Sequence, residues 1–340
     1  MRTKKILAIL LTLALAFALL SPMAHAASSW PTEDFQTGRA PLWLPTRMIH
    51  AFQVMRNTFI EGTRLNSLLI MHNGALVFER YFNGYCADTP HYVASVTKAV
   101  VTALTGIAIA DGYIESTDQA VVDFFPEARD MPGWEASKAD MTVEHLLRMQ
   151  SGIDFSDWEA FWDAFWYSDN PGAVLFTLPQ RSAPGTEFYY SWDTDVLAFL
   201  LERAIGRNLF EYAQETLFGP LGMTSVEWVS TDAGFTMGGW GIDMTPRDMM
   251  RFGYLFLNYG EWDGEQIVPA EFIAAAQPGN EQYGFNVWRY SRLFRGSYEA
   301  AGMNGQKIII IPGLDLIIVR TADVWPFIRN VGAFLWPWGR

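Results

Sequence analysis

The sequence has one cysteine, five histidines and few basic residues for its length of 340. Because Cys86 is the only cysteine, an intramolecular disulfide is excluded and stability must come from packing. We expect Cys86 to be buried or to lie at the end of a strand. The chain carries 37 acidic against 24 basic residues, and its net charge of −13 argues against nucleic acid and anionic membranes as partners.

The motifs of several other enzyme classes are also absent. The chain contains no G-x-S-x-G elbow, no H-E-x-x-H pair and no Gly-rich phosphate loop. Its histidines are scattered, so we expect no metal site, and no cofactor is implied. Half of the residues are hydrophobic (50%), which is enough to bury a large core.

The first 26 residues have the pattern of a secretory signal. Basic residues precede an apolar run over 6–20, and Ala24-His25-Ala26 follows it as a cleavage site. The run is short for a membrane span, although an uncleaved anchor is the alternative. We therefore expect cleavage after Ala26, a periplasmic or secreted protein without stable membrane insertion, and a single domain over 27–340.

Strand patterns occur near both ends of this domain. Asn73-Gly74 between the apolar runs Ser67–His72 and Ala75–Phe82 predicts a β-hairpin. Further patterns predict strands over 284–290, 306–311 and 314–320, and helices over 99–110, 142–147, 193–205 (capped by Asp193), 247–257 and 324–335. We therefore expect an α/β fold, in which one sheet takes strands from distant parts of the chain and a helical subdomain is inserted at roughly 113–245.

The stretch Ala94–Lys98 opens the predicted helix over 99–110, which is apolar on nearly every face and therefore buried. A spacing of three places Ser95 and Lys98 on one face, within side-chain reach. The helix dipole and burial both disfavour the ammonium form of Lys98. A neutral lysine can accept a hydroxyl proton, so Ser95 is a candidate nucleophile in an S-x-x-K arrangement. The alternative is a helix-capping serine beside a lysine that extends to water.

Such an enzyme needs a second proton-transfer group, and Tyr190 in the stretch 184–192 is the candidate. The pattern P-G-x-x-F-x-Y-S at 184–191, followed by Asp193–Leu197, resembles the second motif of the serine β-lactamase-like superfamily. Segments 142–152, 218–223 and 238–253 also resemble family segments, in the family's order. The second-motif variant is most similar to the 6-aminohexanoate-dimer hydrolases and related esterases.

This resemblance implies a β-lactamase and transpeptidase-like fold, an antiparallel sheet flanked by helices. It implies that Ser95 is the nucleophile, Lys98 its activator and Tyr190 the proton shuttle. Residues 300–306 resemble the third motif, where the backbone N–H of Met303 and that of Ser95 would form the oxyanion hole. Either Gly302 or Gly305 could be the motif glycine.

Three features depart from the family pattern. Trp192 stands where many relatives carry Asn, the chain has no Lys-Thr-Gly, and Asn304 stands near the usual histidine of the dimer hydrolases. The first two argue against an efficient β-lactamase, and all three leave the natural substrate open. We expect Trp192, Gly302 and Asn304 to contact the substrate.

Aromatic residues recur at helical spacing over 158–166. They predict either an aromatic wall over the substrate cleft, with Trp162 and Trp166 in contact with substrate, or a helix that packs its apolar stripe into the core.

Together these features predict an exported serine hydrolase that cleaves a small linear amide or ester through an acyl-enzyme on Ser95. The alternatives are a D-Ala-D-Ala carboxypeptidase or weak β-lactamase, and a non-catalytic binding protein on the same fold. The sequence leaves the oligomeric state open.

Overall fold

The computed structural model describes residues 30–32, 34–41, 63–292 and 294–324. The predicted signal segment over 1–26 lies outside these residues. So does the predicted last helix over 324–335, except for Val324, which belongs to a strand.

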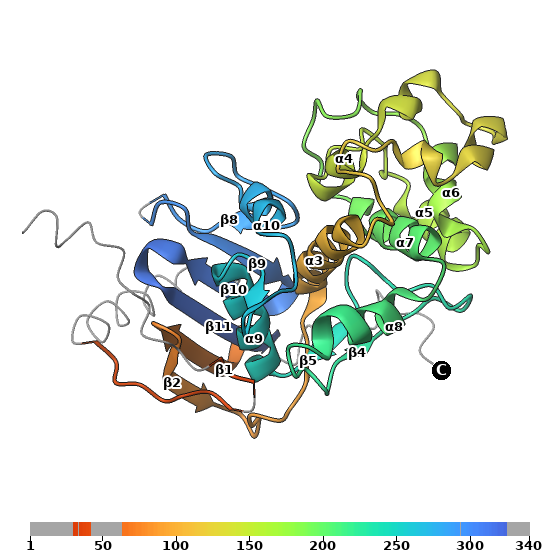
Figure 1. Ribbon diagram of the computed structural model, residues 1–340. Coiled ribbons are helices and arrows are strands. Elements are labelled where there is room, and N and C mark those ends of the chain that lie inside the picture. Colours follow the sequence, from red (N-terminus) through yellow and green to blue (C-terminus); the bar gives the residue numbers. More distant parts are fainter. Residues whose placement is uncertain (1–29, 33, 42–62, 293, 325–340) are drawn as a thin grey trace, which may run out of the picture.

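A six-stranded antiparallel sheet forms one side of the molecule (Figure 1), with strand order β2-β1-β11-β10-β9-β8. Strands β1 and β11 pair along their length, so the sheet joins strands from distant parts of the chain, as predicted. The hairpin is also confirmed, because Asn73 and Gly74 turn the chain with φ of 51° and 72°. The strands of this sheet are β1 (Thr63–His72), β2 (Ala75–Tyr81), β8 (Trp288–Arg289), β9 (Tyr298–Gly302), β10 (Gln306–Ile311) and β11 (Leu316–Val324).

Helices α3 (Thr97–Ala110), α9 (Pro246–Leu257) and α10 (Ala270–Ala276) pack on one face of this sheet (Figure 1). Helix α9 lies so close to the sheet that a Cβ on Gly253 would be 2.8 Å from Ile308 Cγ2. In α3 every residue from Thr97 to Ala108 is buried, which confirms the prediction of a helix enclosed on all sides. Leu68 and Ile70 alternate with Leu69 and Met71 along β1 and belong to a second, smaller apolar cluster on the opposite face.

Between α3 and α9 the chain is mainly helical, and this part lies beside the sheet in Figure 1. Its α-helices are α4 (Val143–Leu147), α5 (Trp158–Trp166), α6 (Pro171–Val174), α7 (Asp193–Ile205) and α8 (Leu209–Ala213). Short strands β3 (His91–Tyr92), β5 (Ile242–Met244) and β4 (Glu227–Trp228) form a second sheet, and β6 (Glu261–Trp262) pairs with β7 (Glu265–Gln266). Short 3₁₀ or π turns cover η1 (Ala94–Val96), Val121–Asp123, Pro126–Asp130, Ala136–Asp140, Leu175–Thr177, Gln214–Phe218, Met303–Gly305 and Pro312–Leu314.

Two predictions about local structure are wrong. The cap residue of α7 is Trp192, because the Asp193 carboxylate instead accepts hydrogen bonds from the Ser151 backbone and hydroxyl, at 3.1 and 2.7 Å. Cys86 is exposed in the loop after β2, where its sulfur lies 3.2 Å from the Thr89 hydroxyl.

The strand predicted over 284–290 is shorter than expected. Only Trp288–Arg289 pairs in the main sheet, because Asn286 has a φ of 56° and turns the chain before them. The buried Asn286 side chain donates to the Thr102 hydroxyl of α3 and accepts from the Thr194 hydroxyl of α7. The segment therefore links α3 and α7 by hydrogen bonds instead of extending the sheet.

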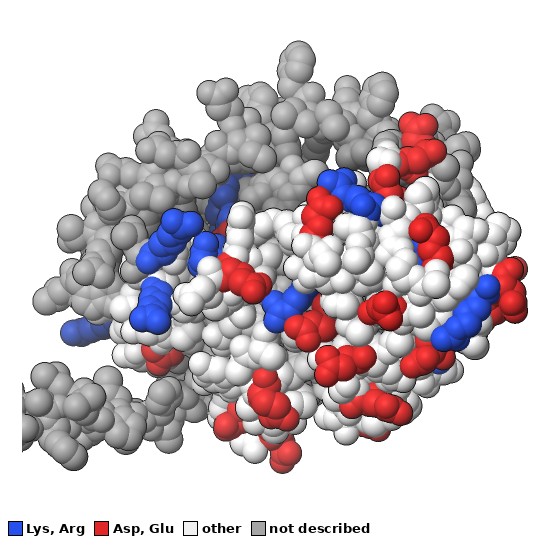
Figure 2. Space-filling view, turned by 90° about the horizontal axis from the view of Figure 1, so that it is seen from above, with Lys and Arg blue, Asp and Glu red and all other residues white. Residues whose placement is uncertain are grey.

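On the face in Figure 2, acidic side chains are scattered over the helical part with basic side chains between them. No helix among the described residues combines the length and the apolar character required to cross a membrane.

Candidate active site

Ser95 lies in the turn η1, directly before α3 and against the main sheet. The preceding residue, Ala94, has a φ of 49°, which is a strained conformation for a residue with a side chain. The Thr97 hydroxyl supports this turn, since it donates to the Ala94 carbonyl at 2.8 Å and accepts from the Ile242 backbone at 3.3 Å. The first turn of α3 has no side-chain cap, so Ser95 does not serve as its helix cap.

Lys98 follows in the first turn of α3 and is only 5% exposed. It therefore does not extend into bulk water. Its Nζ lies 5.4 Å from the centroid of the Tyr190 ring. Tyr190 reaches this position from the loop before α7 and remains 39% exposed. The structure thus brings Lys98 and Tyr190 together from separate parts of the chain, beside the turn that carries Ser95.

No hydrogen bond links the side chains of Ser95, Lys98 and Tyr190 within the described structure. Catalytic hydrogen bonds in ligand-free enzymes are often long and shorten when substrate binds.

Two buried carboxylates flank this group. Burial raises the pKa of Asp193 to about 6, although hydrogen bonds from Ser151 oppose the rise. Burial also raises the pKa of Asp195, and the positive charge of Lys98 opposes that rise. Asp195 Oδ1 accepts from the Gly239 backbone at 2.8 Å, whereas Oδ2 has no hydrogen-bond partner among the described residues.

Sequence reasoning missed Asp195. The sequence feature that could have identified Asp195 is its position in the first turn of the helix that follows Tyr190, where the helix dipole stabilises negative charge. That signal alone cannot show that the carboxylate faces Lys98, because the two residues belong to different helices.

The predicted third motif lies against the Ser95 turn. A Cβ on Gly302, the last residue of β9, would be 2.2 Å from the Val93 carbonyl oxygen, so only glycine fits there. Gly305 needs glycine for another reason, because its φ is 90°. Asn304 also turns the chain, with a φ of 65°, and the Met303 side chain is 55% exposed. The contact with Val93 favours Gly302 as the motif glycine.

Two aromatic groups lie near Lys98 and Tyr190. In the first, the Trp162 ring lies 5.1 Å from Trp166, 5.3 Å from Trp192 and 6.0 Å from Trp240 between centroids. In the second, Tyr190 packs on Trp288 at 5.6 Å and on Tyr283 at 6.1 Å, and Phe188 adjoins both. Trp240 of the first group follows Gly239, whose Cβ position is 2.7 Å from Lys98 Nζ.

The aromatic helix packs one part of its aromatic stripe into the core, and the contact of Trp162 and Trp166 with substrate stays a prediction. In α5, Phe161 and Phe165 are fully buried and belong to the core. Trp162 and Trp166 are only partly buried, and Trp162 contacts Trp166, Trp192 and Trp240. No cluster of three metal-ligating side chains occurs in the described part of the chain.

The fold and the Ser-x-x-Lys turn define a serine enzyme of the acyl-transfer class. The model of the Beta-lactamase family matches residues 63–329, and the chain belongs to that family. It is therefore a serine hydrolase of the S-x-x-K type, as the sequence predicted.

Individual relatives agree with this assignment. The 6-aminohexanoate-dimer hydrolase of Paenarthrobacter ureafaciens is 26% identical over 302 residues, which cover 78% of this chain and 74% of that protein. Esterase EstB of Burkholderia gladioli is 30% identical over 158 residues, 43% of this chain and 40% of that protein.

Solved structures confirm the predicted fold. A putative 6-aminohexanoate-dimer hydrolase from Bacillus anthracis matches with a TM-score of 0.67 and 23% identity, over 84% of this chain and 80% of that one. EstCE1, a hydrolase with promiscuous acyltransferase activity, matches with a TM-score of 0.65 and 18% identity, over 82% of this chain and 93% of that one.

Proposed function

We propose that this protein hydrolyses small esters or linear amides of hydrophobic acids through an acyl-enzyme on Ser95. The observation that carries the proposal is the buried Lys98, which lies against the Tyr190 ring directly after the strained turn of Ser95. Proton transfer during acyl transfer requires a hydroxyl nucleophile with proton-transfer groups beside it, and a buried amine and a phenol can serve as these groups.

In the proposed reaction, Ser95 Oγ attacks the carbonyl carbon and its proton passes to the phenolate oxygen of Tyr190, which becomes a phenol. The bond to the leaving oxygen or nitrogen then breaks, and Tyr190 returns the proton to that atom. Water attacks the acyl-enzyme by the same route, which releases the acid and restores the Ser95 hydroxyl. The backbone N–H groups of Ser95 and Met303 stabilise the oxyanion in both steps.

Asp195 has a positioning role in this proposal. Its carboxylate interacts with Lys98, because the positive charge of Lys98 opposes the rise that burial causes in the Asp195 pKa. The Lys98 amine, held in this way beside the Tyr190 ring, stabilises the negative charge of the Tyr190 phenolate. Tyr190 is therefore the group that accepts the Ser95 proton.

The walls of the site support a hydrophobic acyl or leaving group. Aromatic rings pack on Tyr190 and on Trp240, which lies near Lys98, and such rings bury apolar surface well. The chain lacks the Lys-Thr-Gly that would add a cation for an anionic substrate. The names of two relatives, a dimer hydrolase and an esterase, agree with linear amides and esters as the substrate class.

The test compares p-nitrophenyl esters and a linear amide with wild-type protein, Ser95→Ala and Ser156→Ala, which changes an exposed serine. We expect Ser95→Ala to lose turnover while Ser156→Ala keeps it. Unchanged turnover in Ser95→Ala would refute the proposal. Stable acylation of Ser95 by a fluorescent penicillin would instead indicate the carboxypeptidase or β-lactamase alternative.

We also propose that the protein is exported, supported by the signal-like pattern of residues 1–26. N-terminal sequencing of the protein from its native cell should then begin at Ala27. Full-length protein with an intact Met1 in the cytoplasmic fraction would contradict export.

A further inference from the structure

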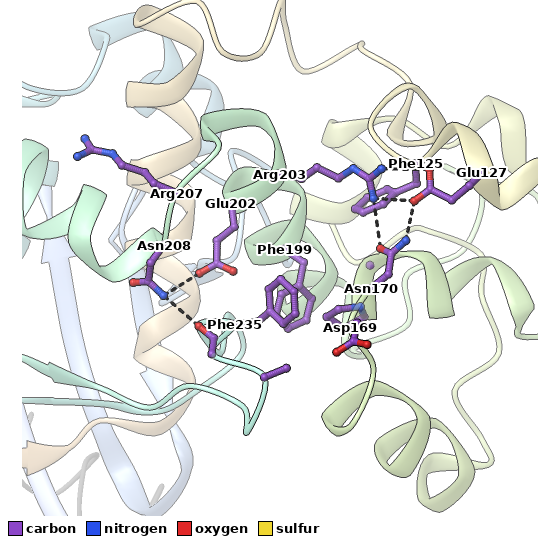
Figure 3. Close-up of a pocket in the computed structure, with 14 residues that line it drawn as sticks. Phe125, Glu127, Asp169, Asn170, Phe199, Glu202, Arg203, Arg207, Asn208 and Phe235 are labelled. Carbon is purple, nitrogen blue, oxygen red and sulfur yellow. Dashed lines mark hydrogen bonds and ion pairs between the residues drawn. The ribbon is translucent and has the colours of Figure 1, made fainter.

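A cavity of about 530 Å³ lies in the helical part, at the far end of α7 from Asp195. Ser95, Lys98 and Tyr190 do not line it. Figure 3 shows Phe199 and Glu202 of α7 facing this space, with Phe235 on one side and Asp169 on the other. Its volume is within the range of small-molecule sites.

The arginines that border this cavity are already neutralised. Both terminal nitrogens of Arg203 bind the Glu127 carboxylate, at 2.6 and 3.1 Å. Arg207 pairs with Glu215 at 2.7 Å, and Figure 3 shows its side chain directed away from the cavity. Two lining carboxylates are left without an ion pair in the described structure, Glu202 and the exposed Asp169. The cavity therefore has an excess of negative charge.

Of these two carboxylates, Glu202 is the unusual one, because the residue is only 8% exposed. Its Oε1 accepts hydrogen bonds from the Leu209 backbone at 2.9 Å and from the Thr236 hydroxyl at 2.7 Å, besides longer ones from the Thr236 backbone and the Asn208 amide. Its Oε2 accepts none from any described residue, and Figure 3 shows the carboxylate between Asn208 and Phe199, at the cavity. Burial raises the pKa of Glu202, because the ionised carboxylate is poorly solvated there. A cation in the cavity would stabilise the ionised form.

The walls next to this oxygen are apolar. The rings of Phe199 and Phe235 meet edge to face at 5.4 Å between centroids. Arg203 lies over a face of a third lining ring, Phe125, at 5.1 Å. Phe199 also packs on Phe165 at 4.7 Å, so Phe235 and the remaining surface of Phe199 form the apolar wall of the cavity. Aromatic rings beside a buried carboxylate are suited to a cation that carries an apolar stem.

We propose that this cavity binds a primary alkylammonium ion, with the ammonium group on Glu202 Oε2 and the alkyl chain along Phe199 and Phe235. Asp169 adds negative charge at the entrance. The site is separate from the catalytic one and does not depend on the function proposed above.

Calorimetric titration of the full chain tests this site with hexylammonium chloride, hexanoate and 1-hexanol, three probes with the same chain and different charge. We expect hexylammonium to bind and the other two to bind at least about tenfold more weakly, because only the cation pairs with Glu202. Glu202→Gln keeps the shape of the side chain and should weaken hexylammonium binding by about tenfold or more.

Two further variants test whether hexylammonium binds in this cavity or in the catalytic site. Ala233→Arg places a cation on an exposed lining residue and should also weaken binding without unfolding the protein. Ser95→Ala should bind hexylammonium as wild type does. The proposal is overturned if hexylammonium does not bind, if hexanoate or hexanol binds equally well, or if Ala233→Arg binds as tightly as wild type.

Discussion

Gly239 lies beside both Lys98 and Asp195: a Cβ at this position would be 2.7 Å from Lys98 Nζ and 2.3 Å from Asp195 Oδ2. Both distances are shorter than any ordinary carbon contact, so the amine and the carboxylate leave no room for a side chain at this position. No other residue can occupy this position without moving one of them.

We therefore expect Gly239→Ala to displace Lys98 or Asp195 and to lower kcat/KM by about 100-fold, since misplacement of a catalytic group by about 1 Å has effects of this size. Gly313→Ala is the matched control, because no atom lies within 4 Å of its Cβ position. Steady-state kinetics on a p-nitrophenyl ester measures both. Full activity in Gly239→Ala would show that the relative position of Lys98 and Asp195 is not critical.

Asp195→Asn removes the charge beside Lys98 and keeps an oxygen for the Gly239 backbone N–H. We expect kcat to fall about tenfold with KM little changed, because the carboxylate acts through Lys98 and does not touch substrate. Steady-state kinetics on a p-nitrophenyl ester separates the two constants. A rise in KM with an unchanged kcat would contradict the positioning role.

Asp193 gives a prediction about stability and pH. Burial raises its pKa from 3.8 to about 6, so the folded state binds this proton more tightly than the unfolded chain. The stabilisation that results is complete below about pH 4 and is lost as the pH rises through about 6, with a size of about 3 kcal/mol. Asp193→Asn should remove this part of the pH dependence. Urea unfolding of both proteins between pH 4 and 7 measures it, and parallel curves would contradict the prediction.

Trp162 tests the aromatic wall. We expect Trp162→Ala to raise KM for an ester of a bulky acid about fivefold, because a lost aromatic contact is worth about 1 kcal/mol. The acetate ester, which is too small to reach the wall, should be little affected. Trp134→Ala, which changes a tryptophan that packs on Phe176 in the helical part, controls for general destabilisation. Equal effects on both esters would place Trp162 outside the substrate site.

Local patterns were sufficient to predict the elements around Ser95. The apolar run after Lys98 indicated an enclosed helix, and the Asn73-Gly74 turn indicated the hairpin whose first strand pairs with β11. These predictions succeed because each depends on neighbours in the chain.

Contacts between distant segments could not be predicted in the same way. Asp193 lost its predicted capping role because Ser151 supplied two hydrogen bonds from another segment. The position of Asp195 beside Lys98 depends on how the loop of Gly239 packs between two helices. A single sequence contains no periodicity that reports such packing.

Two carboxylates of helix α7 bind the loop that contains Thr236 and Gly239. Asp195 holds the backbone of Gly239, and Glu202, seven positions later, holds Thr236. Seven residues are close to two helical turns, so both carboxylates project from one side of the helix. Inserting or deleting a single residue between them would rotate one carboxylate by about 100° and release its end of the loop. Variation in length should therefore be poorly tolerated between Asp195 and Glu202, even where single substitutions are accepted.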